Sequence, residues 1–174
     1  DGDNLIAEYD GAGELIARYI HSPNVIDHPL AMERGGQTFY YVYDGHGSVV
    51  ALTNSAGQVV QKYEYDSYGR ITLDEGYLAN PFTYTAREYD RETGLYFYRA
   101  RVYDPDTGRF LQQDPVWNTN LYAYVGDNPL NRVDPMGEID MDIYDGTYKK
   151  KNPDDCYDRC PKGLWAILKG DGSI

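Results

Sequence analysis

Residues 96–137 read YFYRARVYDPDTGRFLQQDPVWNTNLYAYVGDNPLNRVDPMG, and this stretch is the most informative part of the chain. Within it, DPDTG (104–108) predicts a turn, because its proline sets φ and its glycine allows a left-handed position. Arg99, Arg101 and Arg109 stand among the aromatic residues. Stacking on rings and pairing with aspartate is their expected structural role, and catalysis is the alternative.

A short unit recurs upstream of this stretch and continues into it. The unit is Tyr-Asp followed by a turn that contains Gly, and it begins at Tyr9, Tyr43, Tyr65, Tyr89 and Tyr103. The spacing is irregular but mostly about twenty residues, and a period in that range is typical of elongated or wrapped repeat architectures.

Residues 59–73 show the physical logic of one unit. Alternation divides the first seven between two faces of a strand: Val60, Lys62 and Glu64 on one, and Val59, Gln61, Tyr63 and Tyr65 on the other. Asp66 then starts an Asx-type turn, Gly69 supplies a positive φ, and the next strand follows. The sequence therefore predicts repeated antiparallel β-hairpins, which must stack on one another to be stable.

Composition supports an all-β fold. The chain has 174 residues, with 19 Tyr against 4 Phe and 2 Trp, and with 18 Gly and 9 Pro. Tyrosine suits a half-buried pleated surface, and glycine and proline supply frequent turns. This length suits one domain with a real core.

The charge balance argues against two classes of partner. The formal net charge is −12, which disfavours binding to nucleic acid as a main function and binding to anionic membranes. We find no window that approaches the length of a membrane span, and we expect no cofactor and no metal site.

Residues 98–111 and 120–137 closely resemble the core segment of RHS (YD-repeat) proteins, which include Tc toxin C subunits and wall-associated repeat proteins. The upstream repeats resemble the same family, so that the resemblance covers roughly residues 1–137. It implies a spiral sheet that closes as a hollow shell, in a bacterial protein that is secreted or displayed at the cell surface. The implied domains are YD repeats (1–95), an RHS-associated core that plugs the shell (96–138) and a variable tail, irregular or helical (139–174).

The same resemblance implies self-cleavage of an aspartyl type just after the core. By analogy the two carboxylates are Asp114 and Asp134, each followed by proline, and Arg109 orients the pair or stabilises the oxyanion. The bond cut lies between Glu138 and Ile139. Paired carboxylates suit amide hydrolysis, because one can donate a proton while the other activates water.

Three features depart from the family pattern. Trp117 stands where the family has glycine, the loop up to Asn120 is short, and Glu138 occupies the position before the cut, where the family usually has leucine. The alternative interpretation is that Asp114 and Asp134 only cap turns before proline.

The tail after residue 138 changes in character. Asp140, Asp142 and Asp145 loosely suggest a calcium loop, but Tyr144 breaks the series. The two cysteines of the chain, Cys156 and Cys160, could form an intrachain disulfide, bridge two subunits or remain free thiols. The tail is too short for an ordinary enzyme domain, so we expect that a toxin has been lost or truncated or was never carried. The apolar residues 164–168 are expected to dock on a core, that of this chain or of a partner.

Three functions compete. The first is a structural shell-end module that works with upstream repeats, presents its C-terminal segment as cargo and is capable of self-cleavage. The second is an extracellular subunit that assembles into filaments of identical copies by strand addition at the open first strand. The third, an independent enzyme acting on another substrate, has no nucleophile–base pair or phosphate loop to support it.

Overall fold

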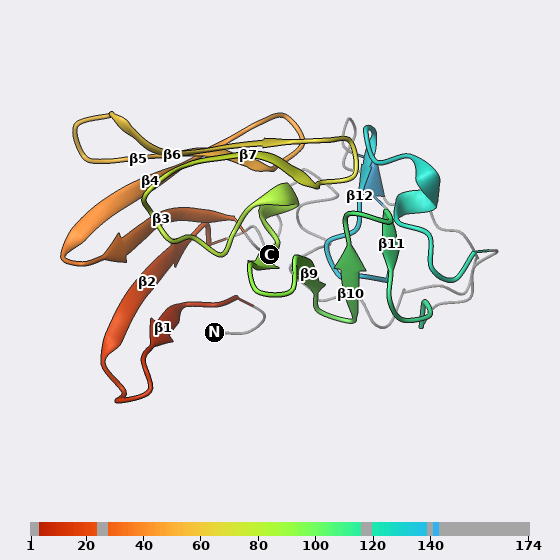
Figure 1. Cartoon of the computed structure of the whole chain (residues 1–174), viewed down its shortest axis with the longest axis horizontal. Coiled ribbons are helices and arrows are strands. Elements are labelled where there is room, and N and C mark those ends of the chain that lie inside the picture. Colours follow the sequence, from red (N-terminus) through yellow and green to blue (C-terminus); the bar gives the residue numbers. More distant parts are fainter. Residues whose placement is uncertain (1–3, 24–27, 116–119, 139–140, 143–174) are drawn as a thin grey trace.

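The computed structural model describes residues 4–23, 28–115, 120–138 and 141–142. Seven strands form one antiparallel meander in chain order: β1 (Ala7–Tyr9), β2 (Leu15–His21), β3 (Pro29–Arg34), β4 (Gln37–Tyr43), β5 (Val49–Thr53), β6 (Val59–Tyr65) and β7 (Ile71–Gly76). The sheet twists strongly, so that β1 and β2 run steeply while β5, β6 and β7 run almost horizontally in Figure 1. The all-β prediction and the run of antiparallel hairpins are confirmed.

The aspartates of the repeat build the turns as predicted. The Asp44 Oδ1 atom accepts backbone N–H groups of His46 at 2.9 Å and Ser48 at 2.8 Å. Asp66 does the same for the residues two and four positions later, at 2.9 and 3.0 Å. The glycine of the second turn, Gly69, has a φ of +85°, which favours a residue without Cβ.

Two of the repeat tyrosines tie their turns to an earlier part of the first sheet. The Tyr65 hydroxyl donates to the Val49 carbonyl at 2.6 Å, and the Tyr43 hydroxyl donates to the carbonyl of Pro29. In these two units the aspartate closes the turn and the tyrosine attaches it to a preceding part of the sheet, whereas the first repeat tyrosine, Tyr9, is 63% exposed.

The predicted faces of residues 59–65 are right at one end of the strand and wrong at the other. Gln61 and Tyr63 are buried and Lys62 is exposed, as expected. Val59, however, is 60% exposed, whereas Val60 is buried. The cause is a bulge, since the ladder between β5 and β6 shifts register beside Leu52, and Val60 is the extra residue.

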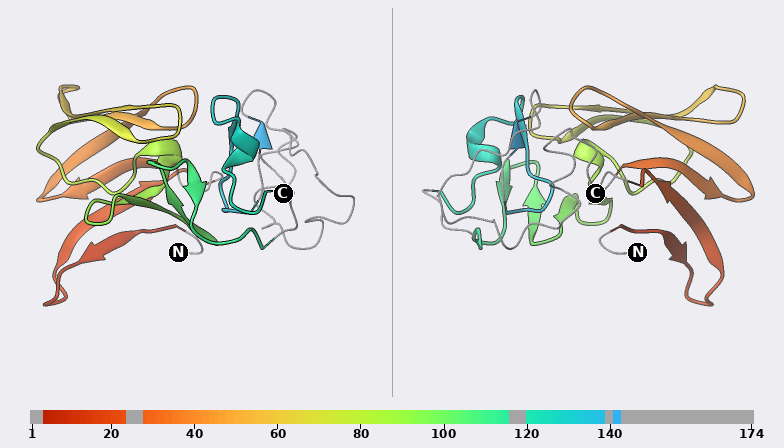
Figure 2. Two further views of the ribbon diagram at one scale, coloured as in Figure 1. Left: turned by 45° about the vertical axis from the view of Figure 1, so that its right-hand side comes forward. Right: turned by 180° about the vertical axis from the view of Figure 1, so that it is seen from behind.

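The chain between the two sheets covers the concave face of the first one. Residues after β7 cross beneath β5–β7 and enter the short 3-10 helix η1 (Tyr84–Ala86), as Figures 1 and 2 show. Phe82 is fully buried there and packs edge-on against Tyr19, with ring centroids 5.1 Å apart. The first core therefore lies between the sheet and this crossing segment.

The second sheet has the order β11-β10-β9-β8 and contains the first part of the core segment, up to Phe110. Its strands are β8 (Glu88–Asp90), β9 (Leu95–Tyr98), β10 (Arg101–Asp104) and β11 (Arg109–Phe110). The predicted DPDTG turn joins β10 to β11, and Gly108 has a φ of +67°. Because β8 lies before residue 95 and belongs to this sheet, the sheet extends across the boundary between repeats and core that the resemblance implies at residues 95 and 96.

Aromatic rings fill the second core. Tyr96, Tyr98, Tyr103 and Tyr124 are fully buried, and the rings of Tyr103 and Tyr124 lie 4.5 Å apart. Tyr124 directly precedes the 3-10 helix η2 (Val125–Asp127). Of the two described aromatic residues after residue 120, Tyr124 thus packs into the core, whereas Tyr122 is exposed.

The last described elements are two very short strands, β12 (Arg132–Val133) and β13 (Met141–Asp142), which pair antiparallel. The predicted tail is otherwise outside the described residues, including Cys156, Cys160, Asp140, Tyr144 and Asp145. In the described part of the chain, we find no helix with the length and apolar character needed to cross a membrane.

Candidate functional site

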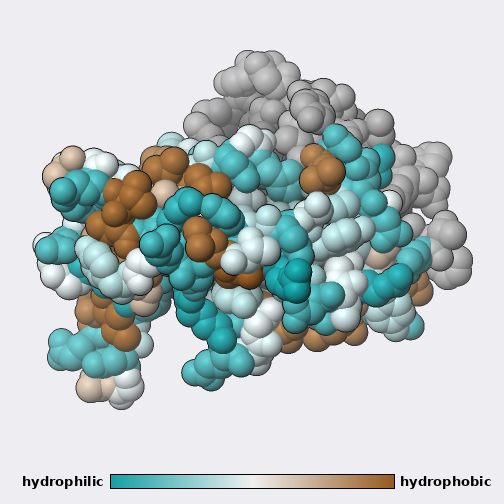
Figure 3. Space-filling model, turned by 45° about the horizontal axis from the view of Figure 1, so that its top comes forward, coloured by the Kyte–Doolittle hydropathy of each residue, from teal (hydrophilic) through white to brown (hydrophobic). Residues whose placement is uncertain are grey.

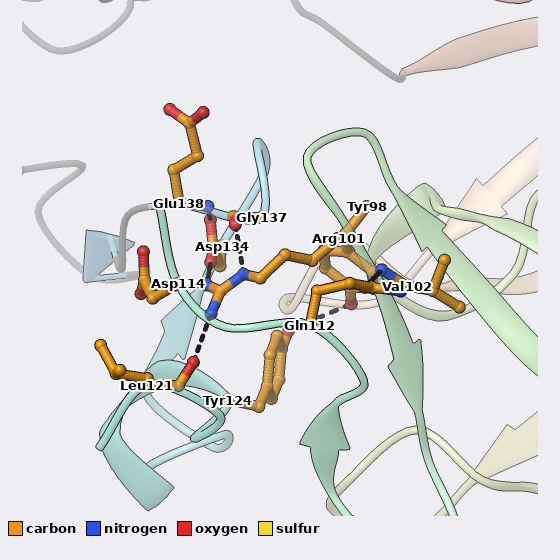
Figure 4. A network of polar contacts seen from close by, with 10 residues as sticks. All are labelled: Tyr98, Arg101, Val102, Gln112, Asp114, Leu121, Tyr124, Asp134, Gly137 and Glu138. Carbon is orange, nitrogen blue, oxygen red and sulfur yellow. Dashed lines mark hydrogen bonds and ion pairs between the residues drawn. The ribbon is translucent and has the colours of Figure 1, made fainter. Parts of the chain in front are cut away.

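Asp114 and Asp134 meet at one arginine, Arg101. The Arg101 Nη2 atom lies 3.1 Å from the Asp134 Oδ2 atom and 3.3 Å from the Asp114 Oδ2 atom. All three side chains are buried, with exposed fractions of 2% for Arg101, 6% for Asp114 and 0% for Asp134. Figure 4 shows the guanidinium directed between the two carboxylates. Two residues that are 20 positions apart in the sequence are therefore brought together, as the aspartyl-type interpretation requires.

The fold positions Arg101 at the first residue of β10. Its guanidinium lies over the Phe110 ring, with the carbon Cζ 3.6 Å from the ring centroid. The Nη1 atom also donates to the Leu121 carbonyl at 3.3 Å. Ring stacking and pairing with aspartate, the expected structural roles of the arginines, thus occur together in Arg101.

Asp114 follows β11 and is fixed by its own backbone. Its N–H donates to the Leu121 carbonyl at 2.8 Å, the same carbonyl that Arg101 contacts. Asp114 and Arg101 therefore share one acceptor, the Leu121 carbonyl. Trp117, one of the departures from the family pattern, lies outside the described residues.

Asp134 holds a turn as well as the arginine. Its Oδ1 atom accepts the Glu138 N–H at 3.0 Å, the same separation of four positions that Asp44 and Asp66 use in the repeats. Its other oxygen accepts from Arg101. The capping role and the carboxylate pair, which the sequence presents as alternatives, coexist in one side chain.

The structure gives Arg109 a different place. Arg109 lies in β11 with an exposed side chain, and its backbone forms an isolated bridge with Ala123. The contacts to both aspartates come from Arg101, which sequence reasoning did not select. One signal in the sequence could have found it: Arg101 and Tyr103 share a face of a strand by alternation, so that an arginine beside a buried tyrosine is expected to be buried and paired.

The arrangement supplies two carboxylates and a fixed positive charge in a site of low exposure. Carboxylates can exchange protons with water and with a peptide nitrogen, and a buried guanidinium can fix their geometry. Burial raises the pKa of the nearby Tyr98 to about 12, so its phenol is neutral and donates to the Tyr124 hydroxyl at 3.2 Å. Within the described ranges, we find no group of three or more His, Cys, Asp or Glu side chains that could hold a metal.

Comparison with known proteins places the chain in a family. The profile of the Teneurin YD-shell matches residues 8–130. The tRNA3(Ser)-specific nuclease WapA of Bacillus spizizenii is 35% identical over 149 residues, covering 79% of this chain and 6% of the relative. Salivary gland surface protein 1 of Aedes aegypti is 39% identical over 130 residues, covering 71% and 4%, respectively.

A solved structure agrees with this relationship. The structure titled TcdB2-TccC3-Cdc42 superposes with a TM-score of 0.57 and 31% identity over 70% of this chain, but over only 6% of that chain. The chain thus spans a small fraction of the proteins that it matches. From the matched residues 8–130 and the repeated tyrosine–aspartate hairpins, we conclude that this chain belongs to the Teneurin YD-shell family, within the RHS/YD-repeat group.

Proposed function

We propose that this chain forms the closing end of a YD shell and cuts its own backbone between Glu138 and Ile139, so that the segment after the cut becomes a separate cargo. The observation that carries the proposal is the contact of one buried arginine with both Asp114 and Asp134, beside the residue that precedes the cut. A secreted or surface-exposed protein is the setting we propose, and the name of the Aedes aegypti relative fits it.

The chemistry we propose is hydrolysis of one peptide bond. Both oxygens of Asp134 accept hydrogen bonds, which suits the ionised form, so Asp134 is the carboxylate that can take a proton from water. Asp114 is then the partner that carries a proton and delivers it toward the nitrogen of Ile139. Water adds to the Glu138 carbonyl carbon, the C–N bond breaks, and the products are a carboxylate at Glu138 and an amino group at Ile139.

The experiment measures the intact mass of the purified chain over time. We expect two fragments that divide after residue 138, and a whole chain when Asp134→Asn or Asp114→Asn is introduced. Asp104→Asn is the matched control, because Asp104 also precedes proline and caps a turn, without contact to Arg101 among the described interactions. A wild-type chain that remains whole, or a cut at another bond, would refute the proposal.

A second candidate function, assembly of identical copies, is favoured by the open edge of the first sheet. Among the described residues, β1 pairs only with β2, and Ile6, Tyr9 and Leu15 at this end are about half exposed or more, at 48%, 63% and 51%. Figure 3 shows further hydrophobic patches over the part of the molecule that contains this sheet. Sedimentation at high concentration tests this function, because a strictly monomeric chain excludes it, whereas Ile6→Lys should weaken any assembly.

A further inference from the structure

Three successive residues, Arg99, Ala100 and Arg101, face three successive carbonyl groups of the segment 135–137. The Arg99 Nη1 atom donates to the Pro135 carbonyl at 2.7 Å. The Ala100 N–H donates to the Met136 carbonyl at 3.3 Å, and the Arg101 Nε atom donates to the Gly137 carbonyl. This is an ordered set of contacts along the chain that leads to the proposed cut.

The backbone of both partners is shaped for this contact. Tyr98 and Arg101 pair across the hairpin of β9 and β10, so Arg99 and Ala100 form a two-residue turn, in which Arg99 has a φ of +56°. Gly137 has a φ of +69°, and a Cβ atom there would lie 2.3 Å from the Tyr98 carbonyl oxygen. The turn and the segment therefore approach each other as closely as a residue without a side chain permits.

The side chain at position 138 takes a different direction. Figure 4 shows the Glu138 carboxylate pointing away from the Arg101 guanidinium, while the Glu138 N–H faces Asp134. The contacts that hold the segment are thus made to its backbone groups. This bears on a departure from the family pattern, since the residue before the cut is Glu138 rather than leucine.

Backbone pairing also holds the chain beyond the proposed cut. β13 pairs with β12, with Val133 opposite Met141 and Arg132 opposite Asp142. Described residues on both sides of the proposed cut are therefore held: residues 135–137 by the turn 99–101, and residues 141–142 by pairing with β12.

We infer that the turn 99–101 is a clamp for the chain's own backbone, in which Arg99 is a positioning residue and Gly137, rather than residue 138, determines whether the bond can be cut. This inference rests on the proposed self-cleavage. The clamp orders the segment 135–137, so that Glu138, whose N–H donates to Asp134, stays beside the carboxylate pair. Such ordering accelerates an intramolecular reaction, because the reacting groups need not search for each other.

The first experiment follows the self-cleavage rate by intact mass for the wild type, Arg99→Ala and Arg18→Ala. Losing a charged hydrogen bond to the substrate backbone should slow Arg99→Ala by about tenfold to a hundredfold. The exposed Arg18 of β2 in the first sheet provides the matched control, and its variant should cut at the wild-type rate. Millimolar ethylguanidinium should partly restore the rate of Arg99→Ala, which a purely structural role of Arg99 would not allow.

The second experiment compares Gly137→Ala with Glu138→Gln. We expect Gly137→Ala to abolish the cut and Glu138→Gln to leave the rate within about threefold, because only the first change meets the clamp. The near-ultraviolet circular dichroism of the buried tyrosines shows whether each variant keeps its fold.

The outcomes separate the two ideas. If the wild type cuts itself and Arg99→Ala cuts equally fast, the clamp is wrong and the proposed function stands. If the wild type cuts and Glu138→Gln is as inactive as Gly137→Ala, the side chain at 138 is the specificity determinant and the clamp is again wrong. A wild-type chain that remains whole overturns the proposed function, and the clamp with it.

Discussion

At the scale of the residue, Arg101 combines three roles that usually belong to different side chains. It pairs with two aspartates, covers the ring of Phe110 and donates to two backbone carbonyls, those of Leu121 and Gly137. A buried charge is tolerated only when its partners are complete, and removing one partner leaves the others in a medium that solvates them poorly. Arg101 is therefore expected to matter for stability as well as for any chemistry.

Arg101→Met should lower the free energy of unfolding by about 3–5 kcal/mol, because it leaves Asp114 and Asp134 buried without their cation. Urea unfolding, monitored by tyrosine fluorescence, measures this loss. Arg109→Met provides the control and should change the free energy by less than about 0.5 kcal/mol, as an exposed substitution usually does. The triple variant with both aspartates changed to asparagine should recover part of the loss, and a loss below about 1 kcal/mol in Arg101→Met would contradict the buried network.

At the scale of the element, the unit that repeats is a turn with its aspartate, its glycine and the tyrosine before them. A turn outside these units has the same geometry, because the Asn54 Oδ1 atom accepts the N–H groups of Ala56 and Gln58 at 3.0 Å, and it differs in what surrounds its glycine, Gly57. A Cβ atom at Gly69 would lie 2.4 Å from the Tyr84 ring, whereas a Cβ atom at Gly57 would have nothing within 4 Å. The two glycines have similar φ values, +85° and +76°, so that they form a matched pair.

Gly57→Ala should destabilise the protein by about 1 kcal/mol, since a left-handed φ is unfavourable for alanine. Gly69→Ala should lower the free energy of unfolding by a further ~1–3 kcal/mol, because the Tyr84 ring must move within a packed core. Thermal unfolding of the two variants under the same conditions compares them. Equal losses would show that the turn, rather than its contact with the second core, determines the requirement for glycine at position 69.

These elements also show what the sequence could reveal. The turns at Asp44 and Asp66 were predictable because aspartate and glycine act on neighbouring backbone atoms. The exposure of Val59 could not be predicted from the sequence, because the bulge that causes it depends on the partner strand β5. Asp114 and Asp134 could be selected by resemblance to the family. Alternation with Tyr103 could have indicated that Arg101 is buried, but its partners could not be predicted, because they depend on how β10 lies against two distant loops.

At the scale of the whole molecule, two tyrosine-rich cores are joined by shared rings. Tyr84 contacts Tyr65 on the side of the first sheet and Tyr124 on the side of the second, with ring centroids 5.8 and 6.4 Å apart. Burial raises the pKa of Tyr98 to about 12, and it raises the pKa values of Tyr103 and Tyr124 well above their usual value. The folded state thus retains phenol protons that an unfolded chain would release near pH 10.

The free energy of unfolding should therefore be independent of these phenols below about pH 10 and should fall as the pH rises from about 10 through 12. Stability falls with rising pH because the pKa of these phenols is higher in the folded than in the unfolded state. High pH therefore favours the unfolded state, which releases the phenol protons more readily. Urea midpoints measured from pH 9 to 12, together with tyrosinate absorbance at alkaline pH, test this. Tyr98→Phe should reduce the slope, and a midpoint that stays constant across this range would contradict the expectation.

The pairing of β12 with β13 has a consequence for timing. If the bond after Glu138 breaks, one strand of this ladder belongs to each product, so that hydrolysis leaves a nicked hairpin rather than two separate molecules. Bond breaking and departure of the cargo are then two events with separate rates. The carboxylates determine the rate of hydrolysis, and the lifetime of a few backbone hydrogen bonds determines the rate at which the cargo dissociates. A denaturing gel and a native sizing column should consequently disagree for as long as the nick remains closed.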